Sequence, residues 1–199
     1  KLDRCLMANG QYGFALNDSP NPRILSCVFT NLTTAAVYLY NGDTTAWIDN
    51  CTFVNVYRVL SLSIDPSNIA VLRNCIASGV TRVGEEGHPQ GNIQFFTNCF
   101  WNVGTSLLVD SDGAGTITDI ETLNAHADAE GNFIADPGFK NDAAGDFRLA
   151  GGSPCINAGA PISDTGPHDY YGGSRLVGRV LDLGAAESQV RLATVLLVR

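Results

Sequence analysis

Hydrophobic and polar residues alternate in short segments along the first half of the chain. The segments "TAWID" (45–49), "IAVLR" (69–73) and "IQFFT" (93–97) start at a constant interval and place apolar side chains at every second position. A period of two is typical of a β-strand, and Val, Ile, Phe and Thr are residues that strands favour. The spacing therefore predicts a strand-containing unit of about 24 residues that repeats.

Cysteines return on the same repeat, at Cys5, Cys27, Cys51, Cys75 and Cys99. The residues two places later are Met7, Phe29, Phe53, Ala77 and Trp101, and the residues four places later include Asn9, Asn31, Asn55 and Gly79. A coil of three short strands and three turns uses this many residues, and stacked coils lie about 4.8 Å apart. Because crossovers between parallel strands are right-handed, the sequence predicts an all-β, right-handed parallel β-helix, a single-stranded solenoid of about 24 residues per coil.

The repeat assigns structural roles to its members. We expect the cysteine and the residue two places on to point inward, so that a sulfur ladder runs beside an aromatic ladder. The asparagine four places on falls at a corner, where it tolerates left-handed backbone, and Gly79 suits the same corner. Metal ligands must converge on a point, whereas a ladder is a line, so we expect buried structural thiols.

The repeat falters first at 84–92, "GEEGHPQGN", where charged and turn residues replace a strand. Two arginines beside this break are one repeat apart in the sequence and should lie one strand spacing from each other. Two interpretations stay open: the arginines pair with the adjacent glutamates, or they bind an anionic ligand. The candidate ligand-binding residues are Tyr57, Arg58, Arg82, Glu85, Glu86 and His88.

A second break, "DSDGAGTITD" at 110–119, places Asp110, Asp112 and Asp119 among glycines. The pattern resembles part of a calcium loop, which makes these three aspartates candidate metal ligands and calcium the one candidate cofactor. A plain Asp-Gly turn is the alternative. Residues 119–128 read as a short helix with Asp119 as its N-cap.

The 24-residue pattern ends after residue 130, and different motifs follow. It contains "ADPGF" (135–139), "GDFRL" (145–149), "GSPCINAG" (152–159), Asp169, Gly172, Arg175 and Gly178, and "DLGAAE" (182–187). This string resembles the C-terminal portion of bacterial extracellular right-handed parallel β-helix proteins with a pectate-lyase-like fold. The resemblance implies a secreted or cell-surface location, and an irregular C-terminal cap that covers the open edge of the last coil.

Three regions follow: β-helix coils over 1–129, the final coil and cap over 130–187, and an apolar, strand-like tail over 188–199. In the cap we expect Arg175 to pair with Asp169 or Asp182, and Cys155 to be a packed small residue. The first coil begins at once near Cys5, so an open coil and an apolar tail could join copies of the chain by strand addition.

The net charge and the apolar content of the chain limit the kinds of partner that we expect. The formal charge of −8 repels phosphate backbones, so nucleic acid is not an expected partner. A helix needs an apolar run of about 18 residues or more to cross a bilayer. The sequence contains no run of that kind, and we expect no transmembrane segment.

Three functions remain open for such a chain: a structural, adhesive or glycan-binding surface domain, a self-assembling unit, and a polysaccharide lyase or glycoside hydrolase. A lyase needs a base and cations beside a uronate, and a hydrolase needs two carboxyl groups about 5–9.5 Å apart. Glu85 and Glu86 are adjacent and should face opposite ways in a strand, so no catalytic residue is assigned. We expect an extracellular or cell-surface β-helix with a structural, adhesive or glycan-binding role, and a polysaccharide lyase or glycoside hydrolase is the alternative. A polysaccharide or cell-surface glycan would bind beside Tyr57, Arg58 and Arg82, and self-association is a further expectation.

Overall fold

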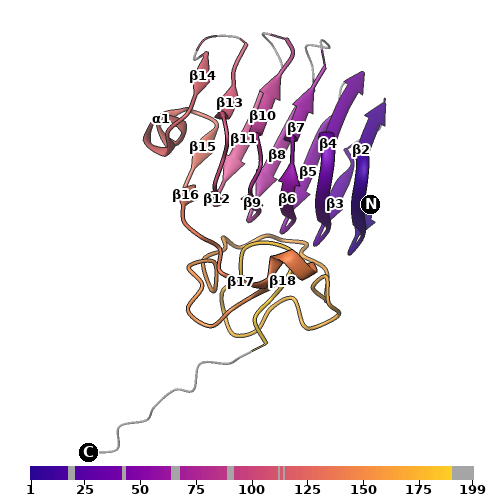
Figure 1. Cartoon of the computed structure of the whole chain (residues 1–199), viewed down its shortest axis with the longest axis vertical. Coiled ribbons are helices and arrows are strands. Elements are labelled where there is room, and N and C mark those ends of the chain that lie inside the picture. Colours follow the sequence, from indigo (N-terminus) through magenta and orange to yellow (C-terminus); the bar gives the residue numbers. More distant parts are fainter. Residues whose placement is uncertain are drawn as a thin grey trace, which may run out of the picture.

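The chain folds into a parallel β-helix of about four turns, which confirms the predicted solenoid (Figure 1). The computed structural model describes residues 1–17, 21–41, 44–63, 68–88, 92–111, 113 and 115–189. Successive strands stack side by side along one axis, and the C-terminal segment forms a separate layer below them in the view of Figure 1.

Each coil contributes strands to three faces. The first face contains β1 (Leu2–Asp3), β3 (Arg23–Leu25), β5 (Thr45–Asp49), β8 (Ile69–Arg73), β11 (Asn92–Phe96) and β15 (Ala129–Glu130). The long strands β2 (Leu6–Asn17) and β4 (Val28–Asn41) bend across the other two faces. The second face continues with β6 (Thr52–Val56), β9 (Ile76–Ser78), β12 (Cys99–Trp101) and β16 (Phe133–Ile134). The third face continues with β7 (Arg58–Leu62), β10 (Arg82–Glu86), β13 (Ser106–Val109) and the antiparallel β14 (Thr116–Ile117).

The remaining elements lie at the C-terminal end. They are α1 (Ile120–Ala125), the hairpin strands β17 (Phe139–Asn141) and β18 (Asp146–Leu149), and the 3₁₀ turn η1 (Asp142–Ala144). Asp119 caps α1 as predicted, because its carboxylate accepts the Thr122 N–H at 2.8 Å.

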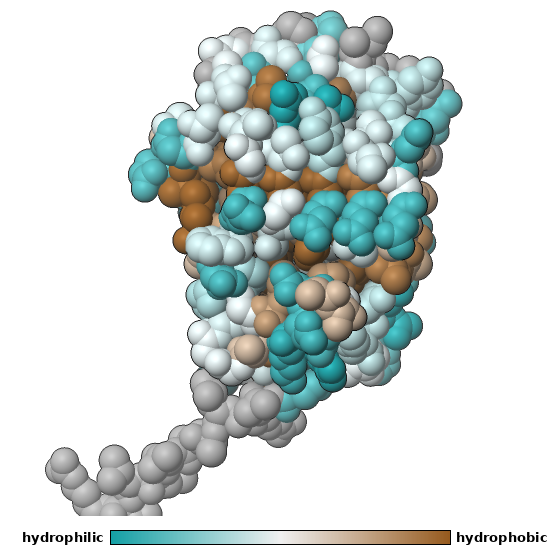
Figure 2. Space-filling model, viewed as in Figure 1, coloured by the Kyte–Doolittle hydropathy of each residue, from teal (hydrophilic) through white to brown (hydrophobic). Residues whose placement is uncertain are grey.

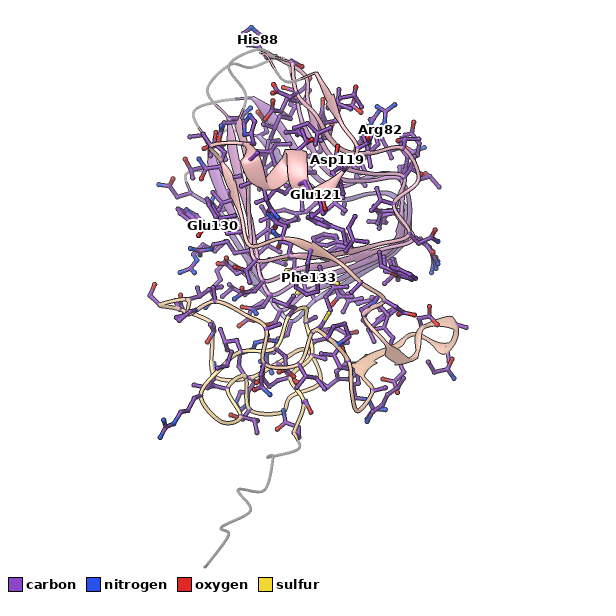
Figure 3. All side chains as sticks on the ribbon, turned by 90° about the vertical axis from the view of Figure 1, so that its left-hand side faces the viewer. Arg82, His88, Asp119, Glu121, Glu130 and Phe133 are labelled. Carbon is purple, nitrogen blue, oxygen red and sulfur yellow. The ribbon has the colours of Figure 1, made fainter. Side chains whose placement is uncertain are left out.

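Stacking in register lays equivalent residues in rows across the coils. Figure 2 shows a band of hydrophobic side chains and, below it, a row of hydrophilic ones crossing the same face. Viewed along the axis in Figure 3, side chains fill the space enclosed by the coils. Phe29 and Phe53 stack there with ring centroids 4.9 Å apart, and full burial of such a ring stabilises the fold by about 1.5–3 kcal/mol.

The predicted left-handed corner is confirmed, and the structure extends it by one coil. The corner residues have φ between 50° and 65° at Asn9, Asn31, Asn55, Gly79 and Asn102. Asn31 donates from Nδ2 to Asn9 Oδ1 at 3.2 Å, so the asparagines also bond to their own copies. At Gly79 an added Cβ would lie 2.8 Å from Asn55 Oδ1, which explains why the corner carries glycine there.

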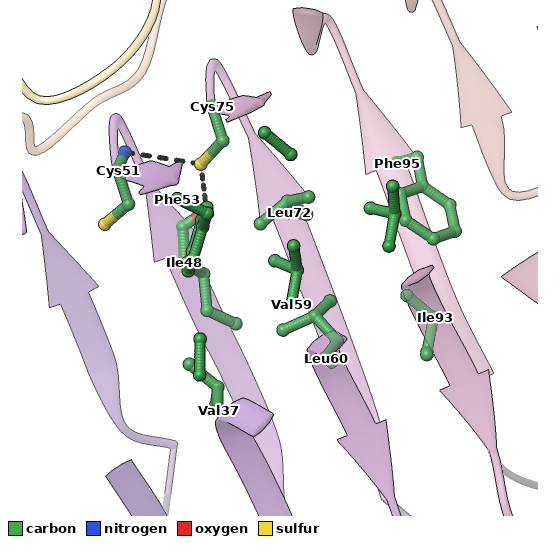
Figure 4. Packing of buried hydrophobic residues seen from close by; sticks show 14 of the residues in the cluster. Val37, Ile48, Cys51, Phe53, Val59, Leu60, Leu72, Cys75, Ile93 and Phe95 are labelled. Carbon is green, nitrogen blue, oxygen red and sulfur yellow. Dashed lines mark hydrogen bonds between the residues drawn. The ribbon is translucent and has the colours of Figure 1, made fainter. Parts of the chain in front are cut away.

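The inward ladder of cysteines bonds neighbouring coils together (Figure 4). The Cys51 backbone N–H donates to Cys75 Sγ at 3.3 Å, and the Cys75 thiol faces the Ile48 carbonyl at 3.5 Å. Cys27, Cys51 and Cys75 have no solvent exposure, and all six cysteines are free thiols. Burial raises the pKa of the Cys51 thiol, so this thiol stays protonated and structural.

The ladder changes residue type at the coil of Cys99, which the sequence repeat did not indicate. Cys99 pairs with Ile76 rather than with Cys75, so the step between these two coils is one position shorter than in the repeat. Asn98 takes the inward position: its Oδ1 accepts the Cys75 N–H at 2.9 Å, and its Nδ2 donates to the Leu72 carbonyl at 2.9 Å. The prediction that Cys99 continues the sulfur ladder is therefore wrong.

The cause is the turn at the first sequence break. Leu62 pairs with Glu86, and Ile69 pairs with Asn92. Ile69 lies seven positions after Leu62, whereas Asn92 lies six positions after Glu86. One residue fewer in this turn shifts every following residue of the coil by one place.

Because of the same shift, the prediction that Trp101 continues the inward aromatic ladder is wrong. Phe100 takes the position beside Ala77 and is fully buried, whereas Trp101 pairs with Ser78 and is 40% exposed. Trp101 is consequently a surface residue of the second face.

The cap is organised by one buried arginine and three buried acids. Arg175 is 1% exposed and donates to the carbonyls of Gly184 at 2.9 Å and Asp182 at 2.7 Å. Its carboxylate partner is Glu187 at 3.6 Å, not the side chain of Asp169 or Asp182 as expected. Each of the three acids instead accepts two backbone N–H groups, which ties the irregular loops of the cap together.

Coil residues hold the cap in place. Asn74 exchanges two hydrogen bonds with the backbone of Ala160, at 2.8 and 2.9 Å. The Ala185 N–H donates to Thr52 Oγ1 at 2.9 Å, and Cys155 packs in one cluster with Cys99. The cap therefore covers the side of the coil stack where the second face begins, and the expectation that it covers the open edge of the last coil is wrong.

The buried acids predict a pH dependence of stability. Burial raises the pKa of Glu187 from 4.5 to about 7, against the opposing effect of its backbone donors and Arg175, and burial also raises the pKa of Asp182. Between pH 4.5 and 7 the folded state binds a proton more tightly than the unfolded chain, so the free energy of unfolding should fall as the pH rises, by up to about 3 kcal/mol. Urea unfolding at pH 5 and pH 7.5 measures the difference, and Glu187→Gln should flatten it; an equal slope in that variant would contradict the assignment.

Candidate functional site

Two arginines and one glutamate form an ion-pair cluster on the third face. Arg58 and Arg82 are register partners on β7 and β10, as their spacing predicted. Arg58 Nε lies 2.8 Å from Glu85 Oε2, and Arg82 Nη1 contacts the same oxygen. One carboxylate therefore serves two guanidinium groups, which leaves the cluster one positive charge in excess.

Glu86 lies apart from this cluster. It points to the inner side of β10, is 6% exposed, and accepts the Ile93 N–H at 2.8 Å. The expectation that the two glutamates face opposite ways is met, and Glu86 serves the structure of the turn. His88 lies at one end of the coil cross-section in Figure 3, away from Arg82.

A hollow of about 430 Å³ adjoins Arg58 on the third face. It is lined by Tyr12, Thr34, Ala35, Tyr38, Tyr40, Arg58, Ser61, Leu62, Ser63 and Gly87. Its volume lies in the range of small-molecule sites, and its lining combines aromatic rings, hydroxyl groups and one guanidinium group.

The tyrosines of the hollow form a continuous aromatic surface. Tyr12 and Tyr38 stack with centroids 5.5 Å apart, and Tyr38 and Tyr40 lie 5.8 Å apart in a tilted arrangement. Tyr12 is 45% and Tyr40 48% exposed, so ring faces remain open to solvent. Burial raises the pKa of Tyr38, which keeps its hydroxyl protonated as a donor.

Arg58 supplies the polar end of this surface. The Tyr57 ring lies 5.0 Å from the Arg58 guanidinium carbon and supports it from the corner of the coil. Nε is engaged by Glu85, while among the described residues neither Nη group of Arg58 has a hydrogen-bond partner. Two donors are thus available beside the tyrosines.

Sequence reasoning found Tyr57, Arg58, Arg82 and Glu85 but missed the three tyrosines. Tyr38 and Tyr40 could have been found from the alternation "VYLY" at 37–40, which places both tyrosines at outward positions of a strand. The neighbouring coil places Tyr12 opposite Ala35, three positions before Tyr38, and the two rings stack across this offset.

The candidate calcium ligands have other partners. Asp110 is 6% exposed and pairs with His126 at 3.6 Å, and Asp119 caps α1. Asp112 lies outside the described residues. Within the described parts of the chain, no three His, Cys, Asp or Glu side chains are arranged to hold a metal ion.

A second hollow of about 580 Å³ lies around Trp101 and Ile134 near the last coil. Its lining residues are uncharged, and they come mainly from the continuous segment 100–107, which joins the end of β12 to the start of β13. The third face offers the richer set of binding groups.

Neither protein-family models, nor curated proteins, nor solved structures match this chain. No helix in the described part of the chain is long and apolar enough to cross a membrane.

Proposed function

We propose that this chain binds an extracellular oligosaccharide that carries carboxylate groups, in the tyrosine-lined hollow of the third face. The observation that carries the proposal is the open aromatic surface of Tyr12, Tyr38 and Tyr40 beside the free Nη donors of Arg58. Sugar rings present flat C–H faces that pack on aromatic rings, while Arg pairs with carboxylates in two-pronged geometry.

Electrostatics favours an acidic sugar at this place. The chain carries a formal charge of −8, yet the Arg58–Arg82–Glu85 cluster has an excess of one positive charge. Local positive potential on an acidic protein attracts an anionic group to this patch. A uronate-containing oligosaccharide supplies both a ring for the tyrosines and a carboxylate for Arg58.

The sequence of the cap supports the extracellular location that the proposal assumes. Its resemblance to bacterial extracellular β-helix proteins with a pectate-lyase-like fold rests on motifs such as "GDFRL" and "DLGAAE". We infer a secreted or cell-surface domain in which the solenoid is a rigid support for glycan binding or adhesion.

Calorimetric titration with oligouronates and with neutral oligosaccharides of equal length tests the proposal. Tyr38→Ala should weaken binding of both classes about tenfold or more, because it removes the central ring of the aromatic surface. Arg58→Gln should weaken binding of the oligouronate alone. Analysis of the incubated sugar for shortened chains shows in the same samples whether binding leads to cleavage.

Trp101→Ala is the matched control, because Trp101 is an exposed aromatic residue of another face. It should leave affinity unchanged. Binding that survives in Tyr38→Ala, or that is lost equally in Trp101→Ala, would overturn the assignment of the site.

A further inference from the structure

The register shift at the coil of Cys99 moves this cysteine from the interior of the solenoid to the side that faces the cap. Successive side chains of a strand point to opposite sides, so a shift of one position turns a side chain to the other side. Cys99 consequently continues the row of Val28, Thr52 and Ile76 instead of the row of Cys75.

This row forms the contact between the coils and the cap. Val28 packs in one cluster with Ala185, and Thr52 Oγ1 accepts the Ala185 N–H at 2.9 Å. Figure 1 shows the strands β6, β9 and β12, which carry the later members of the row, directly above the cap. Cys99 therefore faces the cap from β12.

Cys155 meets Cys99 from the cap. Both cysteines have no solvent exposure, and they belong to one buried cluster with Ile76 and Leu183. The Cys99 thiol donates to the Ala135 carbonyl at 3.2 Å, which leaves its sulfur as the acceptor for the Cys155 thiol. The two thiols are thus in contact across the boundary between coil and cap.

Backbone hydrogen bonds fix both sides of this contact. The Cys99 N–H donates to the Cys75 carbonyl at 2.9 Å, and the Leu183 N–H donates to the Cys155 carbonyl at 2.9 Å. Ser153 Oγ accepts the Cys155 N–H at 3.1 Å. Two cysteines can be bridged only where their Cβ atoms converge. The ladder cysteines project side by side from parallel strands, whereas Cys99 and Cys155 approach from two segments that face each other.

We propose that Cys99 and Cys155 are a disulfide-forming pair that joins the coil stack covalently to the cap under oxidising conditions. With oxidised glutathione as the oxidant, one cysteine thiolate attacks a glutathione sulfur, forms a mixed disulfide and releases one glutathione thiolate. The second cysteine thiolate then attacks the protein sulfur of the mixed disulfide and releases the other glutathione thiolate. The protein loses two electrons and two protons, and one oxidised glutathione is reduced to two thiols.

Burial determines when this bond forms. A hydrogen bond with Cys99, together with burial, raises the pKa of the Cys155 thiol, so the reactive thiolate is scarce while the cap is docked. We therefore expect the bond to form during folding, before the cap closes over the pair. It closes the long loop 99–155, which should raise the melting temperature by at least about 5 °C.

Refolding of the fully reduced chain from urea in a buffer of oxidised and reduced glutathione tests the proposal. The intact mass should fall by two hydrogen atoms, and peptide mapping should give one cross-linked pair that contains Cys99 and Cys155. The melting temperature should exceed that of a sample refolded with a reducing agent. Cys155→Ala should remove both the cross-link and the gain in melting temperature. Cys5→Ala is the matched control, because Cys5 lies in the first coil and far from the pair in sequence, and it should keep both.

Three results for the unaltered chain would overturn the proposal. The first is a refolded chain that keeps its fully reduced mass. The second is a cross-link between ladder cysteines, such as Cys5 and Cys27, in place of the bond between Cys99 and Cys155. The third is the expected cross-link without a rise in melting temperature, which would show that the bond strains the contact between coil and cap.

Discussion

Replacement of Arg175 with Ala is expected to lower the free energy of unfolding by about 3–5 kcal/mol, the usual cost of removing one partner of a buried ion pair. The guanidinium group is 1% exposed and holds Glu187 and the carbonyls of Asp182 and Gly184. Its loss leaves a buried carboxylate without its cation and two carbonyls without donors. Urea unfolding monitored by circular dichroism measures the change.

Arg179→Ala is the control, because Arg179 is an exposed arginine four residues away in the same cap. Its effect should stay within about 0.5 kcal/mol. A loss below about 1 kcal/mol in Arg175→Ala would show that the buried network does not hold the cap.

Asn98→Ala is expected to be about as damaging, with a loss of roughly 3–5 kcal/mol, because two buried polar groups lose a partner at about 1–3 kcal/mol each and a third hydrogen bond is lost. The two groups are the Cys75 N–H and the Leu72 carbonyl, each bonded to Asn98 at 2.9 Å. Asn132 Oδ1 loses the Asn98 side-chain donor at 2.9 Å but keeps the Asn98 backbone N–H at 3.0 Å. The position lies inside the coil stack and has no exposure to water.

Asn98→Cys provides the sharper comparison. It restores the residue that earlier coils use, and a thiol can accept the Cys75 N–H and face the Leu72 carbonyl as Cys75 does for Cys51 and Ile48. Its loss should be no more than about 2 kcal/mol, because a thiol bonds weakly but fills the position. Equal losses in the alanine and cysteine variants would contradict the ladder at this position.

The fold could be predicted from the sequence because every coil of a solenoid repeats the same local pattern of strand, corner and inward-facing residue. Strand alternation, the left-handed Asn9 and Asn31 corner and the inward cysteines recur at a fixed period, so each coil reinforces the assignment of the next. The failure at Cys99 has an equally local cause. The cysteines stay 24 residues apart in the sequence. The turn after Glu86, however, has one residue fewer than the turn after Leu62, so Cys99 pairs with Ile76 instead of Cys75.

The ion-pair part of the site was predictable and the aromatic part was not. Arg58 and Arg82 share a face because their spacing equals one coil, and the register of β7 and β10 preserves it. Tyr12 and Tyr38 stack across an offset of three positions on β2 and β4, whose register shifts between Gly10 and Tyr12. Such irregular pairing leaves no periodic trace in the sequence.

The cap partners of Arg175 escaped prediction for a different reason. Asp169, Asp182 and Glu187 were all possible partners by type, and the choice depends on which carboxylates the backbone N–H groups of irregular loops take up. Local sequence does not specify those loop contacts, whereas the packed structure does.

A crystal structure of the chain with an oligouronate selected by titration would test the proposed glycan site most directly. We expect a sugar ring against Tyr38 in the third-face hollow, with a carboxylate within hydrogen-bond distance of an Arg58 Nη group. Density for the sugar on another face, or a third-face hollow that stays empty at saturating ligand, would contradict the proposed function.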